Sequence, residues 1–231
     1  MDKNSKKIVI ALGGSIISPK EIDTNFLRQF YFLIKKEIKK GYRFIIITGG
    51  GDVARNYQKS ALLINRVPNK ERDWIGIYAT YLNAHLLRAV FKKEAHPFIF
   101  NDRFKVKGFN GYSVIIGSGW SPGWSTDFVA TQIATDLNID KVLILGKPDY
   151  VYTKDPLKNS DAVKIENIEW KDYLKMIPSR WRPGMSMPVD PVAARLAKKE
   201  KKEIVVADGK NLKNLRNILR DKKFKGTKLY V

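Results

Sequence analysis

The sequence of 231 residues contains no cysteine and only two histidines. Without cysteine there is neither a disulfide nor a thiolate nucleophile, and such a composition is typical of proteins of the reducing cytoplasm. His85 and His96 lie in or just after an expected helix and lack the His-Glu-x-x-His spacing of a zinc site. We therefore expect a cytoplasmic location and interpret each histidine as a surface or core-packing residue.

Long hydrophobic runs are also missing. No segment is long and apolar enough to span a bilayer. Lysines precede an apolar stretch near the N-terminus, as in a signal peptide, but the stretch ends at Gly13-Gly14 without a convincing cleavage site. We interpret Lys7–Leu12 as the first core strand and expect no membrane partner.

Acidic residues are few, with 23 Asp and Glu against 43 Lys and Arg, and the formal net charge is +20. A nucleic-acid-binding protein would carry these charges as a basic stripe interleaved with aromatic residues. Here the lysines occur mostly in pairs on expected helix exteriors, such as Lys35-Lys36 and Lys198-Lys199. We interpret them as a solvated surface that attracts polyanions, including nucleotides, and do not expect nucleic acid as a partner. A nucleic-acid regulator is an alternative that rests on charge alone.

Glycine-rich turns follow expected strands at three places: Gly13-Gly14-Ser15, Gly49-Gly50-Gly51 and Gly117-Ser118-Gly119. Without Cβ atoms, such turns let backbone N–H groups converge on an anion, and a following helix adds the positive end of its dipole. Three turns of this kind indicate a substrate with several phosphates. None has the spacing of a Walker motif or of the dinucleotide fingerprint.

Apolar strands alternate with amphipathic helices along the chain. This alternation predicts a single α/β domain over residues 1–231, a three-layer αβα sandwich with a mainly parallel central sheet. The expected strands are Lys7–Leu12, Arg43–Thr48, Pro97–Phe100, Ser113–Ile116, Lys141–Leu145, Glu203–Ala207 and one at the C-terminus. The expected helices are 23–40, 51–65, 71–92, 125–137, 190–199 and 211–219. We expect an irregular segment or hairpin at Phe104–Tyr112 and a long functional loop at Gly146–Ser160.

Ligands of an open parallel sheet bind beyond the carboxyl ends of its strands, where all three glycine turns fall. The turns occur with further segments in the order found in the amino acid kinase superfamily, which the chain resembles over nearly its whole length. Within it, the chain is most similar to uridylate (UMP) kinases of the archaeal type. The segments are Gly13-Gly14-Ser15, Gly49–Gly51 with Ala54-Arg55, Asp73–Ile77 with Asn83-Ala84, Pro122–Asp127, Asp149–Pro156, and Asp190-Pro191 with Ala193-Ala194.

This resemblance implies an enzyme that transfers the γ-phosphoryl group of ATP to UMP, with Mg²⁺ bridging the phosphates. It implies an acceptor-binding part at about 1–125, an ATP-binding part at about 126–231, and a homo-oligomer, either a dimer or a hexamer. The implied catalytic residues are Gly14, Asp127 and Lys147. Those implied to bind the acceptor are Gly50, Gly51, Arg55, Asp73 and Thr126. Those implied to bind ATP are Gly13, Ser15, Lys147, Asp149, Tyr152 and Asp155. No side chain is assigned as a metal ligand.

The chain departs from the family pattern at two positions. Ala11 stands where many members have a lysine, which leaves Lys147 and Arg195 as candidates for the cation that meets the γ-phosphate. Tyr150 replaces the glycine of the usual Asp-Gly, at a backbone position that normally tolerates φ > 0. Two tryptophans, Trp120 and Trp124, flank the acceptor loop and either stack on a base or pack in the core.

Each of these assignments has a structural alternative. Gly14 and Gly50 could only make turns, Asp127 could only stabilise its helix, Arg55 could be a surface residue, and Asp155 could belong to a turn. Two alternative functions stay open as well. One is a sibling kinase that phosphorylates another small acid or phosphate, and the other is a non-catalytic protein that binds a nucleotide or oxyanion.

Overall fold

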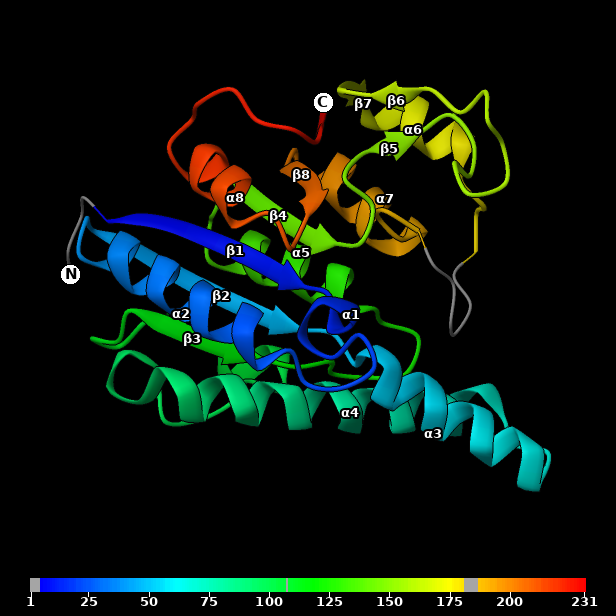
Figure 1. Cartoon of the computed structure of the whole chain (residues 1–231), viewed down its shortest axis with the longest axis horizontal. Helices are drawn as coiled ribbons and strands as arrows, with labels where there is room; N and C mark the ends of the chain where they lie inside the picture. Colours follow the sequence, from blue (N-terminus) through cyan, green and yellow to red (C-terminus); the bar gives the residue numbers. More distant parts are fainter. Residues whose placement is uncertain (1–4, 107, 181–186) are drawn as a thin grey trace.

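The computed structural model describes residues 5–106, 108–180 and 187–231. The described residues form a seven-stranded sheet in the order β3-β2-β1-β4-β8-β9-β7 (Figure 1). Its parallel strands are β1 (Lys6–Leu12), β2 (Tyr42–Thr48), β3 (Val114–Gly117), β4 (Lys141–Gly146) and β8 (Glu203–Asp208). At one edge, β9 (Thr227–Tyr230) runs antiparallel to β8 and pairs in parallel with β7 (Asn167–Glu169). A separate small sheet pairs β5 (Val151–Tyr152) with β6 (Lys164–Ile165).

Helices cover both faces of the sheet. One core contains Ile8, Ile10 and Leu12 of β1, and it is covered by α2 (Thr24–Ile38), α4 (Asn69–Phe91) and α8 (Leu212–Leu219). The other core contains Val9 and Ala11 and is covered by α5 (Thr126–Asp136), α6 (Trp170–Met176) and α7 (Pro191–Lys199). Alternate residues of one strand therefore enter opposite cores, as they must in a sheet buried on both faces. The expected three-layer αβα sandwich is confirmed.

The expected caps explain where several helices begin. Asp23 accepts a hydrogen bond from the Phe26 amide at 2.8 Å, and Ser125 accepts one from the Phe128 amide at 3.0 Å. Asp190 accepts from the amides of Val192 and Ala193 at 2.7 and 3.2 Å, with proline as the first residue of α7. Each cap satisfies an amide that the helix itself leaves unpaired.

At the β3 edge the expected strand 97–100 is wrong, and the described part of Phe104–Tyr112 is irregular, as expected, without the alternative hairpin. Residues 97–100 are not a strand, because this segment meets the edge of β3 only at the bridges of Ala95 with Val114 and Phe100 with Gly117, and bends between them. In the described part of Phe104–Tyr112 there is no hairpin; the chain passes through a short 3₁₀ helix at Arg103–Lys105 and a turn at Gly111, where φ is +87°. Short apolar runs beside a sheet edge do not require regular pairing.

Some elements have no counterpart among the expected ones. These are α1 (Gly14–Ile17), α6 and the short strands β5, β6 and β7. Each has only two to seven residues, too few for a hydrophobic period to be recognised. The expected loop 146–160 therefore includes β5.

The turns that follow β1 and β2 touch through their backbones. A Cβ atom built on Gly14 would lie 2.0 Å from the Gly51 nitrogen, and one on Gly49 would lie 2.4 Å from the Gly14 nitrogen. Gly51 also has φ of +67°, which disfavours any side chain. Because β1 and β2 are adjacent parallel strands, their turns leave the sheet at the same place and fit there only without side chains. From this contact α3 (Gly51–Ile64) begins and projects from the body of the molecule (Figure 1).

We predict opposite effects on stability from two glycine-to-alanine substitutions. Gly14→Ala is expected to lower the midpoint of thermal unfolding strongly, because its methyl group would collide with the backbone of the Gly51 turn. Gly76→Ala, inside α4, is expected to be neutral or stabilising, because only the Gln58 side chain must move and alanine favours the helix by about 1 kcal/mol. Circular dichroism during heating measures both. Equal midpoints for Gly14→Ala and the parent would contradict the packed-turn interpretation.

Candidate active site

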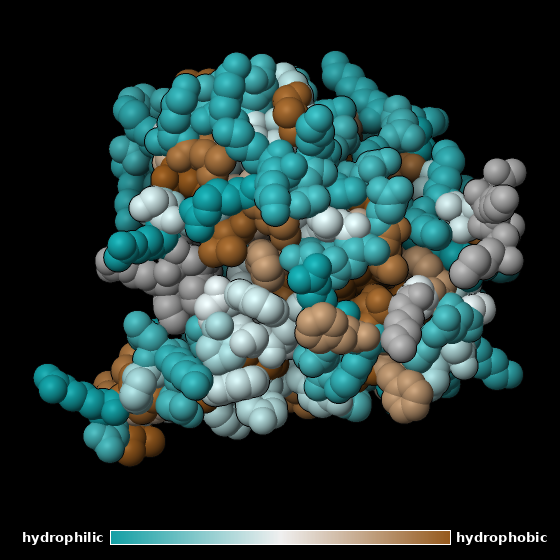
Figure 2. Space-filling view, turned by 180° about the vertical axis from the view of Figure 1, so that it is seen from behind, coloured by the Kyte–Doolittle hydropathy of each residue, from teal (hydrophilic) through white to brown (hydrophobic). Residues whose placement is uncertain are grey.

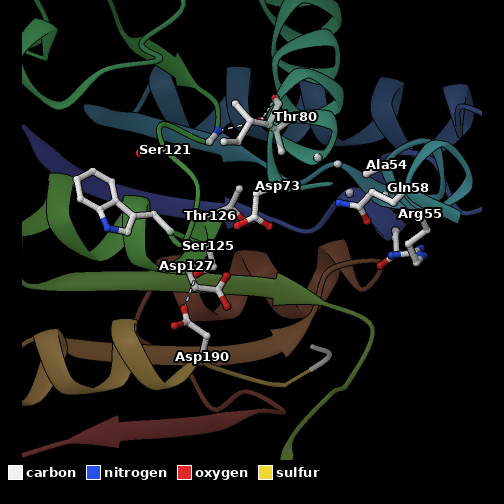
Figure 3. Close-up of a pocket in the computed structure, with 18 of the residues that line it drawn as sticks. Ala54, Arg55, Gln58, Asp73, Thr80, Ser121, Ser125, Thr126, Asp127 and Asp190 are labelled. Carbon is white, nitrogen blue, oxygen red and sulfur yellow. Dashed lines mark hydrogen bonds between the residues drawn. The ribbon is translucent and has the colours of Figure 1, made fainter. Parts of the chain in front are cut away.

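A cavity of about 290 Å³ opens at the carboxyl edge of the sheet (Figure 3). Its walls come from the turn after β1, the start of α3, one face of α4, the loop after β3, the start of α5 and the segment before α7. Of the residues expected to act at the site, the cavity brings together Gly14, Ser15, Gly50, Gly51, Arg55, Asp73, Thr126 and Asp127. Residues separated by more than 110 positions thus meet where the parallel strands end.

Two helix N-termini line this cavity. Gly51 is the first residue of α3, and Thr126 is the first residue of α5. The first amides of a helix lack partners within the helix, and its N-terminus carries a partial positive charge. The cavity is therefore suited to bind an anion such as a phosphate.

Hydrogen bonds join the start of α5 to the start of α7. The Ser125 hydroxyl donates to the Asp190 carboxylate (Figure 3). The Asp190 backbone amide donates to the Asp127 carboxylate. Lost hydration, followed by the charge of Asp190, raises the pKa of Asp127 well above its usual value. The side chain of Asp127 is thus held in place at a position where its negative charge is unfavourable until a cation compensates it.

Asp73 fixes the loop that follows β3. Its carboxylate accepts a hydrogen bond from the Gly123 amide at 2.8 Å. About two turns further along α4, the Thr80 hydroxyl accepts a hydrogen bond from the Gly119 amide at 2.8 Å. Burial raises the pKa of Asp73, while the Gly123 hydrogen bond and the nearby Arg72 oppose this increase. The Gly119 amide is thus already paired with a hydroxyl, so the third glycine turn is a loop anchor more than an open anion cradle.

Arg55 lies at the rim of the cavity. Its guanidinium pairs with Asp52 one turn earlier in α3, and 52% of its side chain is exposed. A half-exposed pair of this kind contributes little to stability, on the order of 0 to 1 kcal/mol. The pair with Asp52 therefore holds the guanidinium at the cavity, and no buried ion pair has to be broken for it to bind an anion.

The sequence and the fold are similar to those of known proteins. The sequence model described as the amino acid kinase family matches residues 6–208. The chain belongs to the amino acid kinase family. Uridylate kinase of Methanosarcina acetivorans is 34% identical to it over 214 residues, which cover 92% of this chain and 91% of that protein. Uridylate kinase of Pyrococcus abyssi is 29% identical, covering 94% of this chain and 96% of that protein. The crystal structure of uridylate kinase from Archaeoglobus fulgidus superposes with a TM-score of 0.83 at 28% identity, over 96% and 99% of the two chains.

Of the residues that the amino acid kinase pattern assigns to ATP, Ser15 lines the cavity, whereas Gly13, Lys147, Asp149, Tyr152 and Asp155 lie outside its lining. A Cβ atom on Gly13 would lie 3.4 Å from the Gly146 Cα, so Lys147 leaves the sheet next to the first glycine turn. Asp149 accepts the Tyr152 hydroxyl at 2.8 Å, and this hydrogen bond is the main cause of a raised Tyr152 pKa. Asp155 accepts the Leu157 amide at 3.0 Å within a turn. This contact supports the turn interpretation of Asp155.

The structure shows how Ala11 and Tyr150, the two departures from the family pattern, are accommodated. Ala11 is only 3% exposed and has Ile47 and Ile144 as its strand neighbours, so this position lies in the second core. Tyr150 is buried and has no positive φ, and the Lys164 ammonium lies 5.0 Å from the centre of its ring. The aromatic side chain is therefore accommodated without strain in the backbone.

The structure separates the two candidate cations. Lys147 is exposed next to the Gly13 turn. The Arg195 guanidinium instead donates to the Ser179 carbonyl at 2.8 Å, and Arg195 is absent from the lining of the cavity. Lys147 is thus the better placed of the two.

Several residues of the site were given no site role from the sequence. Asn83 donates to the Gly49 carbonyl at 2.7 Å and holds the second turn against α4. Gln58, Thr80, Ser121, Met187 and Asp190 line the cavity. Thr80 and Asn83 are buried and three positions apart, so polar residues at helical spacing within an otherwise apolar stretch were the available signal.

We predict that Asp127→Asn separates catalysis from stability. The pKa of Asp127 is raised, so between the ordinary value of 3.8 and the raised value the folded protein keeps a proton that the unfolded chain has lost. Stability of the parent protein therefore falls as pH rises through that window, and asparagine removes this loss. The variant should melt at an equal or higher temperature at neutral pH, with the advantage disappearing in acid, while kcat falls by orders of magnitude.

Melting temperatures across pH and steady-state kinetics test this prediction. Asp136→Asn is the matched control, because Asp136 lies on the same helix and pairs with Arg103 away from the cavity. If Asp127→Asn loses stability and activity in proportion, Asp127 serves only to support its helix.

Proposed function

We propose that this protein is a uridylate kinase, which transfers the γ-phosphoryl group of ATP to UMP and gives UDP for pyrimidine nucleotide biosynthesis. The proposal rests on one observation above all. A single cavity combines two helix N-termini and Arg55 at the glycine turns with Asp73 across from them. The first group suits a phosphate, and a carboxylate suits the hydroxyls of a ribose. The similarity to uridylate kinases over more than 90% of both chains supports the same acceptor.

The acceptor phosphate is placed at the start of α3. There the backbone of Gly50 and Gly51 and the Arg55 guanidinium supply donors, and Thr126 adds a hydroxyl from the start of α5. One Asp73 oxygen is used by the Gly123 amide, which leaves the other for a ribose hydroxyl. These residues form the acceptor half of the proposed site.

Phosphoryl transfer needs in-line positioning of the two phosphates and compensation of the negative charge that spreads over the transferring group. Gly13, Gly14 and Ser15 lie between the acceptor turn and Lys147, so we place the transferring group there. Lys147 adds a positive charge, and Asp149, Tyr152 and Asp155 flank the ATP side. Neither a nucleophilic side chain nor a covalent intermediate is needed.

Mg²⁺ would be held mainly by phosphate oxygens. Within the residues that the structure describes, no three His, Asp or Glu side chains cluster as a metal site. Both Asp190 oxygens already accept hydrogen bonds, from Ser125 and from the start of α7, whereas Asp127 faces the cavity. One carboxylate plus substrate phosphates is an ordinary environment for this ion, and its positive charge would make an ionised Asp127 favourable.

The acceptor and ATP halves, about 1–125 and 126–231, are proposed as parts of one domain. The two hydrophobic cores support a single domain, because each core contains residues from both halves. Leu12 and Leu145 share one core, and Ala11 and Ala193 share the other.

A homo-oligomer, at least a dimer, is supported by uncovered apolar side chains on α3 and α4. Leu63 and Ile64 at the projecting end of α3, and Tyr78 and Leu82 on α4, are 62% to 85% exposed. Figure 2 shows hydrophobic residues at this projection, at the lower left of the view. Apolar patches of this kind are typical of protein interfaces.

A cytoplasmic location is supported by the absence of cysteine from the sequence. Among the described residues, no helix combines the length and the apolar character that crossing a bilayer requires.

The direct test is a coupled assay of ADP release with Mg²⁺ and ATP. We expect turnover with UMP, and weaker or no turnover with CMP, AMP or small carboxylates. Turnover only with a carboxylate would identify a sibling kinase. Binding of both nucleotides without UDP formation would identify a binding protein and overturn the proposal.

A second test concerns the cation that replaces the lysine missing at Ala11. Lys147→Met is expected to lower kcat by a factor on the order of 100, the effect of removing one preorganised donor to the transition state. Arg195→Met is the control, since Arg195 is engaged by the Ser179 carbonyl and should leave kcat nearly unchanged. A normal rate in Lys147→Met would show that the charge comes from another residue.

A further inference from the structure

Two tryptophans lie close together in the loop after β3, but their surroundings differ. Trp120 is 7% exposed, and its indole N–H points to the Phe100 carbonyl at 3.4 Å. Trp124 is 40% exposed and lines the cavity. Trp120 is thus a core residue, whereas a large aromatic surface of Trp124 stays open at the site.

The Trp124 ring packs against two other aromatic rings. Its ring centre lies 5.0 Å from that of Phe128 and 6.4 Å from that of Trp120, at tilted and edge-on angles. The preceding residue, Gly123, has φ of +88° and donates its amide to Asp73, and the Trp124 amide donates to the Ser121 carbonyl at 3.1 Å. The left-handed glycine and the two hydrogen bonds fix the backbone from which the indole projects, and the two rings pack against it.

Packing alone does not account for this arrangement. Within the described part of the chain the Trp124 indole N–H has no hydrogen-bond partner, and two-fifths of the side chain faces solvent. A preorganised and partly exposed aromatic ring beside a polar cavity is the typical platform for a nucleic-acid base, because every base has a π face.

The location of Trp124 fits one part of the proposed acceptor. Asp73, proposed to bind the ribose, is joined directly to Gly123, while the phosphate end lies at Gly50, Gly51 and Arg55. The base of a nucleoside monophosphate extends from the ribose away from its phosphate. Trp124 directly follows Gly123, whose amide is bound by the Asp73 carboxylate proposed to bind the ribose.

We infer that Trp124 is a specificity-determining residue that stacks on the base of the acceptor nucleotide, supported from behind by Phe128. This inference rests on the proposed acceptor site and extends it. It makes the acceptor a phosphate ester that carries a flat heterocycle, because a small acid without a ring would gain nothing from Trp124. Stacking adds affinity without recognising the hydrogen-bond pattern of the base. Trp124 therefore favours UMP and CMP alike over phosphates that lack a base.

The experiment measures binding by calorimetry without ATP, using UMP, CMP and ribose 5-phosphate. Trp124→Ala and Trp124→Leu are expected to weaken UMP and CMP binding on the order of ten-fold, and Trp124→Phe to retain most of the affinity. Binding of ribose 5-phosphate and the KM for ATP should not change. Trp124→Leu keeps an apolar contact with Phe128, so it controls for lost packing, and melting temperatures identify any variant that fails to fold.

Phe104→Ala is the matched control, because Phe104 is an aromatic residue that is 83% exposed and absent from the lining of the cavity. Unchanged UMP binding in Trp124→Leu, or an equal loss for ribose 5-phosphate, would overturn the inference. If the parent protein binds UMP through Trp124 but forms no UDP, the proposed kinase activity fails and the stacking inference stands. If it binds no UMP, both fail.

Discussion

At the carboxyl edge of the sheet, the turn after β1 and the turn after β2 touch with no side chain between them. Gly14 lies against Gly49 and Gly51 so closely that a methyl group would overlap backbone atoms. This contact sets the point where α3 begins, and Asn83 binds the same turn to α4. The proposed acceptor and transfer positions are therefore neighbours because two backbones pack directly, which places their amides within reach of adjacent phosphates.

The electrostatics of the site depend on this framework. Loss of water and the charge of Asp190 raise the pKa of Asp127, so its ionised form is unfavourable unless a cation lies nearby. The helix N-termini at the cavity favour negative charge, and a cation accompanying the phosphates would favour Asp127 in turn. In the proposed site, the binding of a metal-bound donor would therefore be coupled to the ionisation of Asp127.

The loop after β3 has a separate physical role. Its glycine amides are paired with Thr80 and Asp73 instead of being free for an anion. The consequence is a firmly anchored loop that presents Trp124 beside the cavity. In the proposed site, recognition of the ribose and base of the acceptor would depend on α4, and recognition of its phosphate on α3.

The main elements could be predicted from the sequence because their signals are local. The apolar run of β2, the caps Asp23, Ser125 and Asp190, and the glycines after β1 and β2 each reflect a constraint acting within a few residues. The wrong strand at 97–100 had an equally good local pattern. It fails because β3 is met only at two bridges, which depends on the path of the chain in space.

For the site, the sequence by itself determined which residue types were present at the ends of parallel strands, and its resemblance to a family indicated their roles. Only the tertiary structure decided how they are engaged. It paired Arg195 with Ser179 and the Gly119 amide with Thr80, buried Trp120 and left Trp124 open. These outcomes depend on contacts between residues far apart in the chain, whose geometry follows from the packing of whole helices on the sheet and from no local pattern.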